Sequence, residues 1–389
     1  MLAHRSSLSS LLAALAVGTL GCNDDGLADP APPVVATGTT GTPPSPSTSS
    51  GAASTGVADS TGGSTAGGSE DSGTTGPGIQ DPGCPACMVL ADGLMSGRGI
   101  TTDLQFVYFT DQERGTVERV QKGGGEGLVI AMDQAQPYDV AVADEHVFWT
   151  TFVGTGSVQR VVLPDGPPIT IASDLYPRAI QTSGGFVYWT TFDDLEGRVR
   201  RMPADGVGQT PETLVSVDGG VPSLFVEGPL VYFTAHVTPD VGSFIEPPRR
   251  LPLGGVYAAS SAAPTAFADL TELSTFEAQP WGVASSGNFV FWANGVGDPA
   301  NLPDRLRSTA ADGTAQPSTL APGQTAPWGV AVDAQYVYWT DHTEVKAIPH
   351  AGGDVIVLAE MQNIARSITV DDQFVYWITR ERVLQRPKP

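Results

Sequence analysis

A short aromatic phrase recurs along this chain at intervals close to 40 residues. Each copy runs bulky apolar residue, Val, Tyr or Phe, Trp or Phe, and then usually Thr. The valines of the seven copies are Val107, Val147, Val187, Val231, Val290, Val337 and Val375. They are separated by 40, 40, 44, 59, 47 and 38 residues. A period near 40 with one aromatic strand per unit is typical of a β-propeller, in which blades repeat around a central channel.

The segments around each phrase predict the other strands of a blade. An apolar inner strand and a tight turn precede the phrase, and an alternating strand such as Val158–Val161 follows it. A fourth strand, as in Ile169–Ala172, ends most units. The seventh unit stops after its third strand, but Met88–Asp92 reads like Ile356–Glu360 of the sixth. We therefore expect an all-β propeller of four-stranded antiparallel blades, with seven blades favoured, six as the alternative, and an N-terminal strand closing the last blade.

The phrase Tyr338-Trp339-Thr340-Asp341 and its degenerate copies resemble the YWTD repeats of lipoprotein-receptor propellers. They also resemble the repeats of a group of bacterial lipoproteins that carry such propellers. The resemblance covers roughly 300 residues and rests on a motif that forms the fold. The receptor family has six blades, whereas seven aromatic phrases occur here. The resemblance implies ligand binding by a non-catalytic propeller and names no ligand.

The N-terminal part predicts export and attachment to a membrane. Residues Met1–Gly21 combine a weakly positive start with a short Leu/Ala-rich stretch, which is typical of a signal peptide. Cys22 follows a small residue and resembles the acylated cysteine of a bacterial lipoprotein, with an ordinary cleaved signal as the alternative. Residues 22–83 are rich in Gly, Ser, Thr and Pro and carry acidic but no basic side chains, which predicts a disordered tether. The predicted location is the bacterial cell envelope, and the predicted propeller covers 84–389.

Two further cysteines, Cys84 and Cys87, form a Cys-x-x-Cys pair at the junction of tether and propeller. In an exported chain with no helix signal after the pair, we favour a small structural disulfide. A redox pair and free or metal-bound thiols are the alternatives. Zinc would need four ligands, and the sequence shows no second pair of Cys or His residues to complete the set.

The net charge of −22 bears on the partners of the chain. An acidic surface argues against nucleic acid or anionic lipid as a partner, because both carry negative charge. A protein, peptide or glycan ligand of unknown identity remains, in addition to the lipid anchor.

One set of side chains is expected to surround the mouth of the channel. These residues occupy the second position of each inner strand, and every blade contributes one. They are Arg98, Tyr138, Arg178, Pro222, Trp281, Trp328 and Arg366. Arg offers a planar fork of donors, and Trp or Tyr offers a flat stacking face, so the ring suits an acidic peptide, a polar glycan or a chain terminus. The alternative is that the tryptophans pack between blades and the arginines pair with neighbouring acids.

Two inserts are expected near the same face, because they join the second and third strands of neighbouring blades. They cover residues 235–254 in the fourth blade and 294–304 in the fifth. Long ordered loops in a compact repeat are often functional, and the pair would resemble a partial lid. A tolerated surface insertion is the alternative.

We expect no catalysis, no cofactor and no metal site. The histidines lie in different units without a shared motif, and neither Gly-x-Ser-x-Gly nor His-Glu-x-x-His occurs. Asp111, Asn294 and Asp341 follow aromatic strands and are placed near the mouth, but they form too sparse a set for a metal. The acids at 103, 144, 333 and 371 are expected to cap hairpin turns on the opposite face.

Three functions therefore remain open. The favoured one is a tethered binding or scaffold propeller of the cell envelope. The second is a metal-dependent hydrolase or lyase, and the third is a purely structural envelope component.

Overall fold

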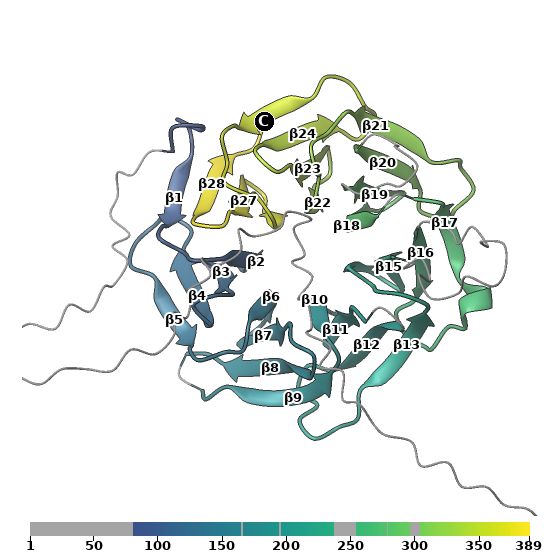
Figure 1. The fold of residues 1–389 in the computed structure, drawn as a ribbon, viewed down its shortest axis with the longest axis horizontal. Coiled ribbons are helices and arrows are strands. Elements are labelled where there is room, and N and C mark those ends of the chain that lie inside the picture. The colour runs from purple at the N-terminus through teal and green to yellow at the C-terminus, as the bar shows by residue number, and fades with distance from the viewer. Residues whose placement is uncertain (1–80, 165, 194–195, 237–253, 278, 296–303) are drawn as a thin grey trace, which may run out of the picture. The chain divides into compact units, whose positions relative to one another are not determined.

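The computed structural model describes residues 81–389, apart from 165, 194–195, 237–253, 278 and 296–303. The described residues form seven four-stranded antiparallel sheets, which are arranged as blades in a ring (Figure 1). The chain is thus a seven-bladed β-propeller, as the spacing of the aromatic phrases predicted. Residues 1–80 lie outside the described part, so the signal peptide, the lipidation of Cys22 and nearly all of the tether stay predictions.

The first four blades follow one another along the chain. Blade 1 contains β2 (Gly97–Thr102), β3 (Phe106–Asp111), β4 (Thr116–Gln121) and β5 (Leu128–Ala131). Blade 2 contains β6 (Pro137–Ala143), β7 (His146–Thr151), β8 (Gly156–Val162) and β9 (Ile169–Asp174). Blade 3 contains β10 (Pro177–Ser183), β11 (Phe186–Thr191), β12 (Gly197–Pro203) and β13 (Glu212–Val217). Blade 4 contains β14 (Ser223–Glu227), β15 (Leu230–Ala235), β16 (Gly255–Ser260) and β17 (Thr271–Thr275).

The remaining blades complete the ring. Blade 5 contains β18 (Pro280–Ser286), β19 (Phe289–Asn294), β20 (Arg305–Ala310) and β21 (Ser318–Pro322). Blade 6 contains β22 (Val330–Val332), β23 (Tyr336–Thr340), β24 (Val345–Pro349) and β25 (Ile356–Ala359). Blade 7 contains β26 (Ile368–Val370), β27 (Phe374–Ile378), β28 (Val383–Pro387) and β1 (Met88–Ala91). A short 3-10 helix, η1 (Phe267–Asp269), precedes β17. No helix of the described chain is long and apolar enough to cross a membrane.

Blade 7 joins the two ends of the described chain. Its outer strand β1 pairs antiparallel with β28, with Val89 opposite Leu384 and Ala91 opposite Val383. Leu90 of β1 is 1% exposed and belongs to a hydrophobic cluster with side chains of blades 7 and 1. The pairing covers the edge that β28 would otherwise leave open, and β1 becomes the outer edge strand of blade 7.

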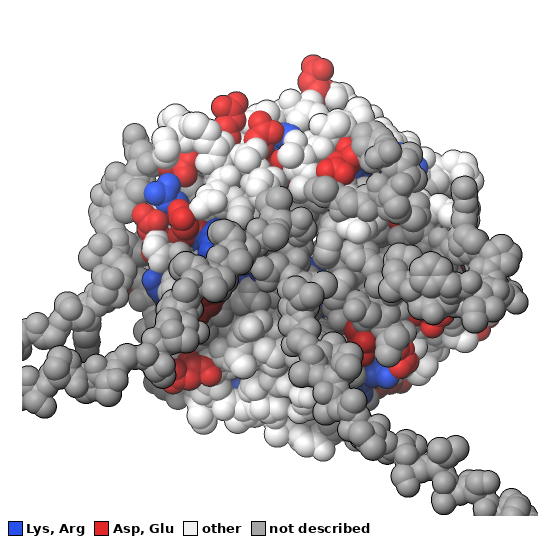
Figure 2. Space-filling view, viewed as in Figure 1, with Lys and Arg blue, Asp and Glu red and all other residues white. Residues whose placement is uncertain are grey.

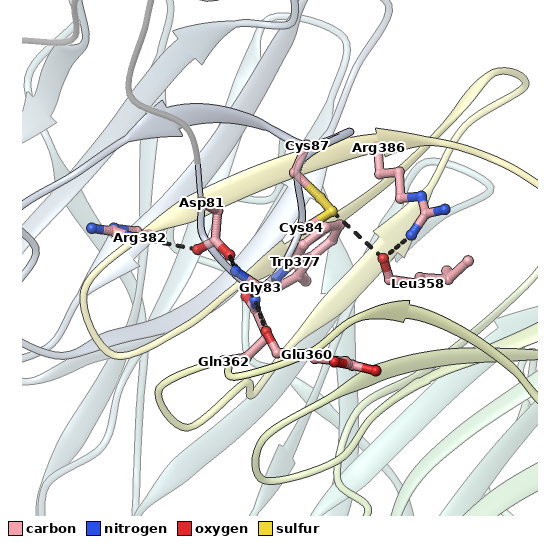
Figure 3. Close-up of a disulfide and its surroundings, with 10 residues drawn as sticks. All are labelled: Asp81, Gly83, Cys84, Cys87, Leu358, Glu360, Gln362, Trp377, Arg382 and Arg386. Atoms are coloured by element: carbon pink, nitrogen blue, oxygen red, sulfur yellow. Dashed lines mark hydrogen bonds and ion pairs between the residues drawn. A yellow bond between two sulfur atoms is a disulfide. The ribbon is translucent and has the colours of Figure 1, made fainter.

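A short disulfide loop holds the chain just before β1 against blades 6 and 7 (Figure 3). Cys84 and Cys87 are joined by a disulfide, and both side chains are buried. The backbone N–H of Glu360 donates to the carbonyl of Gly83 at 2.9 Å. Asp81 lies 3.2 Å from Arg382 Nη1 and accepts from Gln362 Nε2, also at 3.2 Å. Gly83 is required at this point, because a Cβ there would collide with the backbone of Glu360.

The second strand of each blade supplies the core, and both of its faces are buried between neighbouring blades. The largest fully buried side chains include five tryptophans of these strands, Trp149, Trp189, Trp292, Trp339 and Trp377. Four indole N–H groups donate to a polar side chain 15 residues earlier, at 2.9–3.2 Å. The acceptors are Gln134, Asp174, Gln324 and Gln362. Each bond ties the loop that enters a blade to the core of that blade, since a buried indole N–H needs an acceptor.

Three of the four predicted turn-capping acids do cap their turns. Asp371 Oδ1 accepts from the backbone N–H groups of Gln373 and Phe374, both at 2.8 Å, and Oδ2 accepts from the hydroxyl of Tyr376 at 2.8 Å. Asp103 and Asp333 make the same three bonds in blades 1 and 6. Asp144, in blade 2, instead adopts a left-handed backbone with φ 51°.

Candidate ligand-binding site at the mouth of the central channel

The inner strands of all seven blades line one central cavity of about 520 Å³. Every residue predicted to ring the channel mouth lies in its wall. These residues are Arg98, Tyr138, Arg178, Pro222, Trp281, Trp328 and Arg366. The structure therefore brings the whole predicted set together around one space, whose size is typical of a small-molecule pocket.

The threonine of the aromatic phrase positions this ring. Thr110 Oγ1 donates to the carbonyl of Tyr138 at 2.9 Å, and Thr150 Oγ1 donates to the carbonyl of Arg178 at 2.6 Å. Thr234 and Thr340 make the equivalent bonds to Trp281 and Arg366, at 2.9 and 2.6 Å. In each case the threonine belongs to the preceding blade along the chain. The threonine, which recurs in the repeats, thus fixes the backbone of the ring residue at the mouth, whose identity differs from blade to blade.

Arg178 lies at the centre of an aromatic cage. Its Cζ is 4.6 Å from the ring centroid of Phe192, 4.9 Å from those of Tyr138 and Trp281, and 5.6 Å from that of Phe152. The side chain is only 2% exposed. Aromatic faces attract a cation, and the attraction grows when water is excluded. The cage therefore keeps a full positive charge inside the wall of the cavity.

A stacked pair of tryptophans forms the neighbouring wall. The rings of Trp281 and Trp328 are 4.4 Å apart between centroids and inclined by 13°. On its other side Trp281 stacks on Phe192 at 6.4 Å, and His236 meets it edge-on at 4.6 Å. His236 Nε2 is also 3.0 Å from the carbonyl of Pro280. Trp281 and Trp328 are both half-buried, so part of each ring faces the open mouth. They pack on each other across blades 5 and 6 and still line the cavity.

The other two arginines have different surroundings. Arg98 is half-buried, its Nε donates to Gln112 Oε1 at 2.6 Å, and its Cζ is 5.5 Å from the ring centroid of Tyr138. Arg366 is 4% exposed and donates to Ser96 Oγ at 3.1 Å and to the carbonyl of Gly97 at 2.8 Å. Arg366 therefore also bridges blades 7 and 1, while Arg98 is the more accessible of the two.

One carboxylate, Asp139, lies in the same wall. Its Oδ1 accepts from the backbone N–H of Val140 at 2.9 Å, and its Oδ2 accepts from that of Ile180 at 3.0 Å. Burial raises the pKa of Asp139 to about 6, against the lowering effect of those two N–H groups and of the Arg178 charge. Asp139 nevertheless lines the cavity and is half-buried there. A titratable group with a raised pKa in a pocket is a marker of functional sites.

Three polar residues that we expected near the mouth are structural instead. Asp111 accepts from the backbone N–H groups of Met95 and Ser96 at 2.8 and 2.9 Å. Asp341 pairs with Lys346 at 2.9 Å. Asn294 donates to the carboxylate of Glu277, which is itself 0% exposed. None of the three residues lines the central cavity. Within the described residues no group of three or more His, Cys, Asp or Glu could hold a metal ion.

Sequence reasoning missed four residues of this site: Phe152, Phe192, His236 and Asp139. Phe152, Phe192 and His236 share one position, two residues after the threonine of the aromatic phrase, so an aligned repeat contains the signal. Asp139 stands at the third position of its inner strand, where the other blades have only Gly, Ala or Ser. Most of the predicted inserts, 237–253 and 296–303, lies outside the described residues, and so the lid stays a prediction.

The charge of the site differs from that of the whole chain. Among the described residues, the charged members of the cavity wall are Arg98, Arg178, Arg366 and Asp139. The chain as a whole has 42 acidic and 20 basic side chains. Acidic side chains are scattered around the rim of the face shown in Figure 2. The described wall thus contains more basic than acidic residues, and low-dielectric walls focus the field of such charges inside a cleft.

Comparisons with known proteins identify the fold and leave the family open. No protein-family model and no curated protein matches the chain. A streptogramin B lyase structure matches at 12% identity and a TM-score of 0.55, over 76% of this chain and 95% of that one. A computationally designed protein matches at 13% and 0.52, over 77% and 98%. A gluconolactonase from Xanthomonas campestris matches at 14% and 0.50, over 82% and 99%. At these identities the likeness shows a β-propeller and nothing about activity.

Proposed function

We propose that this chain is a non-catalytic binding propeller that captures a protein, peptide or glycan ligand at the mouth of its channel. The observation that carries the proposal is the cavity wall itself. It combines a caged cation, a stacked tryptophan pair and a half-buried arginine around one space of about 520 Å³. Aromatic and arginine side chains of this kind are the residues on which binding energy concentrates.

We also propose that the protein is exported and held in the cell envelope by a lipid on Cys22. This part is supported by the sequence alone, through the signal-like segment Met1–Gly21 and the acidic Gly/Ser/Thr-rich segment 22–83. A chain of about 60 such residues spans roughly 40–45 Å on average, enough to lift a domain off a membrane. Metabolic labelling with a radioactive fatty acid tests the lipidation. Loss of label in Cys22→Ser supports the anchor, and labelling that persists in this variant contradicts it.

The experiment for the binding role compares two aromatic substitutions on a glycan and peptide array. Trp328→Ala removes part of the cavity wall. Phe289→Ala removes an aromatic ring at the hairpin end of blade 5, which is more exposed than Trp328 and lies outside the cavity wall. We expect captured ligands to be lost with Trp328→Ala and kept with Phe289→Ala. Ligands that bind both variants equally would contradict binding at the mouth.

Two alternatives give different results in the same material. A purely structural component would capture no ligand that depends on the mouth. A metal-dependent hydrolase or lyase would turn over a lactone or glycan substrate, and its activity would fall with a chelator. Asp139 is the side chain to test in that case, because a carboxyl group with a pKa of about 6 is suited to acid–base chemistry. Turnover that is lost in Asp139→Asn would overturn the non-catalytic assignment.

A further inference from the structure

The side chains of the cavity wall indicate a narrower class of ligand than the propeller fold alone does. In the part of the chain that the structure describes, three arginines and one aspartate are the charged residues of the wall, and the whole chain has a net charge of −22. The positive charge of Arg178 sits behind aromatic rings, where it is screened by water far less than a surface charge. A ligand that carries a carboxylate therefore gains free energy at this mouth, and it would gain none on the acidic rim.

The aromatic part of the wall requires a ligand with a flat apolar face. Trp281 is enclosed between Trp328 on one side and Phe192 on the other. Trp328 ends this stack, and its half-buried ring lines the cavity. The part of this ring that borders the cavity is a flat apolar surface, of the kind on which the C–H face of a sugar ring packs.

The polar part of the wall matches hydroxyl groups. Asp139 already accepts one backbone N–H on each oxygen, and a carboxylate oxygen has a second lone pair. Small hydroxyl side chains line the same cavity, namely Thr101, Ser223, Ser367 and Thr369. Acceptors and donors from blades 1, 2, 4 and 7 thus surround one cavity. They suit a ligand with several hydroxyls better than a peptide backbone, which exposes one N–H and one C=O per residue.

We propose that the mouth of the channel binds an anionic saccharide of the hexuronate class. The sugar carboxylate lies toward Arg98 and the buried arginines, one ring packs on Trp328, and ring hydroxyls donate to Asp139. This inference rests on the proposed function, since it names the ligand of the same site. An acidic peptide shares the carboxylate, but it lacks the flat apolar face and the row of hydroxyls.

The test measures binding of trigalacturonic acid and of its methyl ester by calorimetry. The ester has the same rings and hydroxyls as the acid and lacks its charge, so the pair isolates the carboxylates. The protein is the full-length chain, purified in detergent so that any lipid is retained. We expect the acid to bind at least tenfold more tightly than the ester at low salt, and this preference to shrink as salt is added. An acidic trimer of glutamate, blocked at both ends, is the peptide arm.

Two arginine variants separate a charge effect from a folding effect. Arg98→Gln removes the accessible cation of the cavity wall, whereas Arg114→Gln removes a cation of the same blade that lies outside the wall. We expect Arg98→Gln to reduce the preference for the acid several-fold while binding of the ester is unchanged, and Arg114→Gln to leave both as they are. Trp328→Ala should weaken acid and ester alike. Circular dichroism melting of each variant confirms that the fold is intact.

Each result either supports or overturns the saccharide inference, and each can be told apart from a result that overturns the proposed binding function. A strong preference for the acid that depends on Arg98 supports an anionic saccharide. Equal binding of acid and ester overturns the anionic part. Binding of the glutamate trimer without binding of either sugar overturns the saccharide class, and in both of these cases the mouth remains a binding site. Absence of all three interactions overturns the inference, and the array comparison of Trp328→Ala with Phe289→Ala then decides the binding role separately.

Discussion

Two carboxylates in opposite regions of the propeller show how differently this fold treats the same side chain. Asp371 sits in the hairpin turn of blade 7, and Asp139 sits in the wall of the channel. Burial acts to raise the pKa of both carboxyl groups. At Asp371 the Lys122 ammonium, the turn N–H groups and the Tyr376 hydroxyl outweigh burial and lower the pKa to about 2. At Asp139 burial prevails and raises the pKa to about 6.

The comparison separates a side chain that stabilises from one that is available to a ligand. The donors to Asp371 belong to the protein itself and lie at 2.7–2.8 Å, so its ionised form is more favourable in the folded protein than in the unfolded chain. The ionised form of Asp139 is less favourable in the folded protein than in the unfolded chain, because its pKa is raised. A group that costs stability and borders a cavity is a candidate for function, whereas a group that adds stability at a turn needs no such explanation.

The largest expected difference comes from removing one oxygen of the turn carboxylate. Asp371→Asn keeps an acceptor for the two turn N–H groups, but it loses the charged acceptor for Lys122 and Tyr376. Bonds to a charged group contribute about 1.5–3 kcal/mol, so we expect unfolding to become easier by about 2–3 kcal/mol in urea at pH 7. Asp144→Asn, at an exposed turn position in blade 2, is the matched control and should change stability by less than about 0.5 kcal/mol. Equal effects of the two changes would remove the distinction between capped and uncapped turns.

The next effect tests how the fold supports the channel wall. Thr150→Val keeps the shape of the side chain but removes the bonds of Oγ1 to the Arg178 carbonyl and from the Asp139 N–H. Leaving buried backbone groups without a partner costs about 1–3 kcal/mol, and we expect about 2 kcal/mol here. Thr150→Ser, which retains the hydroxyl, should recover most of the loss in a thermal melt. If Ser and Val destabilise to the same degree, the hydroxyl does not hold this wall.

Much of this fold was predictable from the sequence, because the spacing of the aromatic phrases shows where each blade begins and how its strands align with those of the other blades. Seven copies of one phrase place every inner strand, and from there the second residue of each strand falls at the channel. Asp111, Asn294 and Asp341 were misplaced for a physical reason. They follow the aromatic strands, yet their side chains are held by the Ser96 N–H, the Glu277 carboxylate and the Lys346 ammonium. The position of a residue relative to a strand end predicts where its backbone lies in the blade. The direction of its side chain depends in addition on which nearby polar groups need a hydrogen-bond partner.

Asp139 and the aromatic cage show what kind of residue remains difficult to predict. Asp139 differs from the small residues at its position in every other blade, so a repeat aligned position by position exposes it as an exception. Phe192 could be found in the same way, but its contact with Trp281 spans blade 4. A contact between blades 3 and 5 cannot be read from any single repeat, although Pro222 at blade 4 is the smallest member of the ring.

A third prediction concerns pH: lowering the pH should raise the stability contributed by Asp139 and reduce the stability contributed by Asp371. The folded pKa of Asp139, about 6, lies above its unfolded value, so the folded state binds the extra proton between about pH 6 and pH 4. Lowering the pH from 7 to about 4.5 should therefore add about 1–2 kcal/mol of stability in the wild type relative to Asp139→Asn. Asp371 behaves oppositely: its contribution is present above about pH 4 and is lost as the pH falls toward 2. Melting curves of wild type and both Asn variants from pH 2 to 8 check the two signs. A constant difference between wild type and Asp139→Asn across that range would show that the channel carboxylate is not strained.

The smallest expected effect isolates the tyrosine that completes each capped turn. In blade 6 the hydroxyl of Tyr338 donates to Asp333 Oδ2 at 2.8 Å, and Lys388 lies 2.9 Å from the same oxygen. Burial and this carboxylate both raise the pKa of Tyr338, so the hydroxyl stays protonated and remains a donor at neutral and moderately alkaline pH. Tyr338→Phe removes one bond that Asp333 shares with the turn N–H groups and Lys388, and we expect a loss of about 1 kcal/mol.

A double-mutant cycle makes that value specific to the pair. Tyr338→Phe should cost about 1 kcal/mol in the wild type and close to nothing when Asp333 is already Asn, because the charged acceptor is then absent. Urea unfolding at pH 7 measures both steps. If the cost is the same in both backgrounds, the tyrosine stabilises the blade through its ring alone, and the turn carboxylate is held by the backbone and Lys388. In that case the contrast with Asp139 lies in the balance of burial and charge: Lys388 pairs with Asp333 at 2.9 Å, whereas at Asp139 burial outweighs the lowering effect of the Arg178 charge on the pKa.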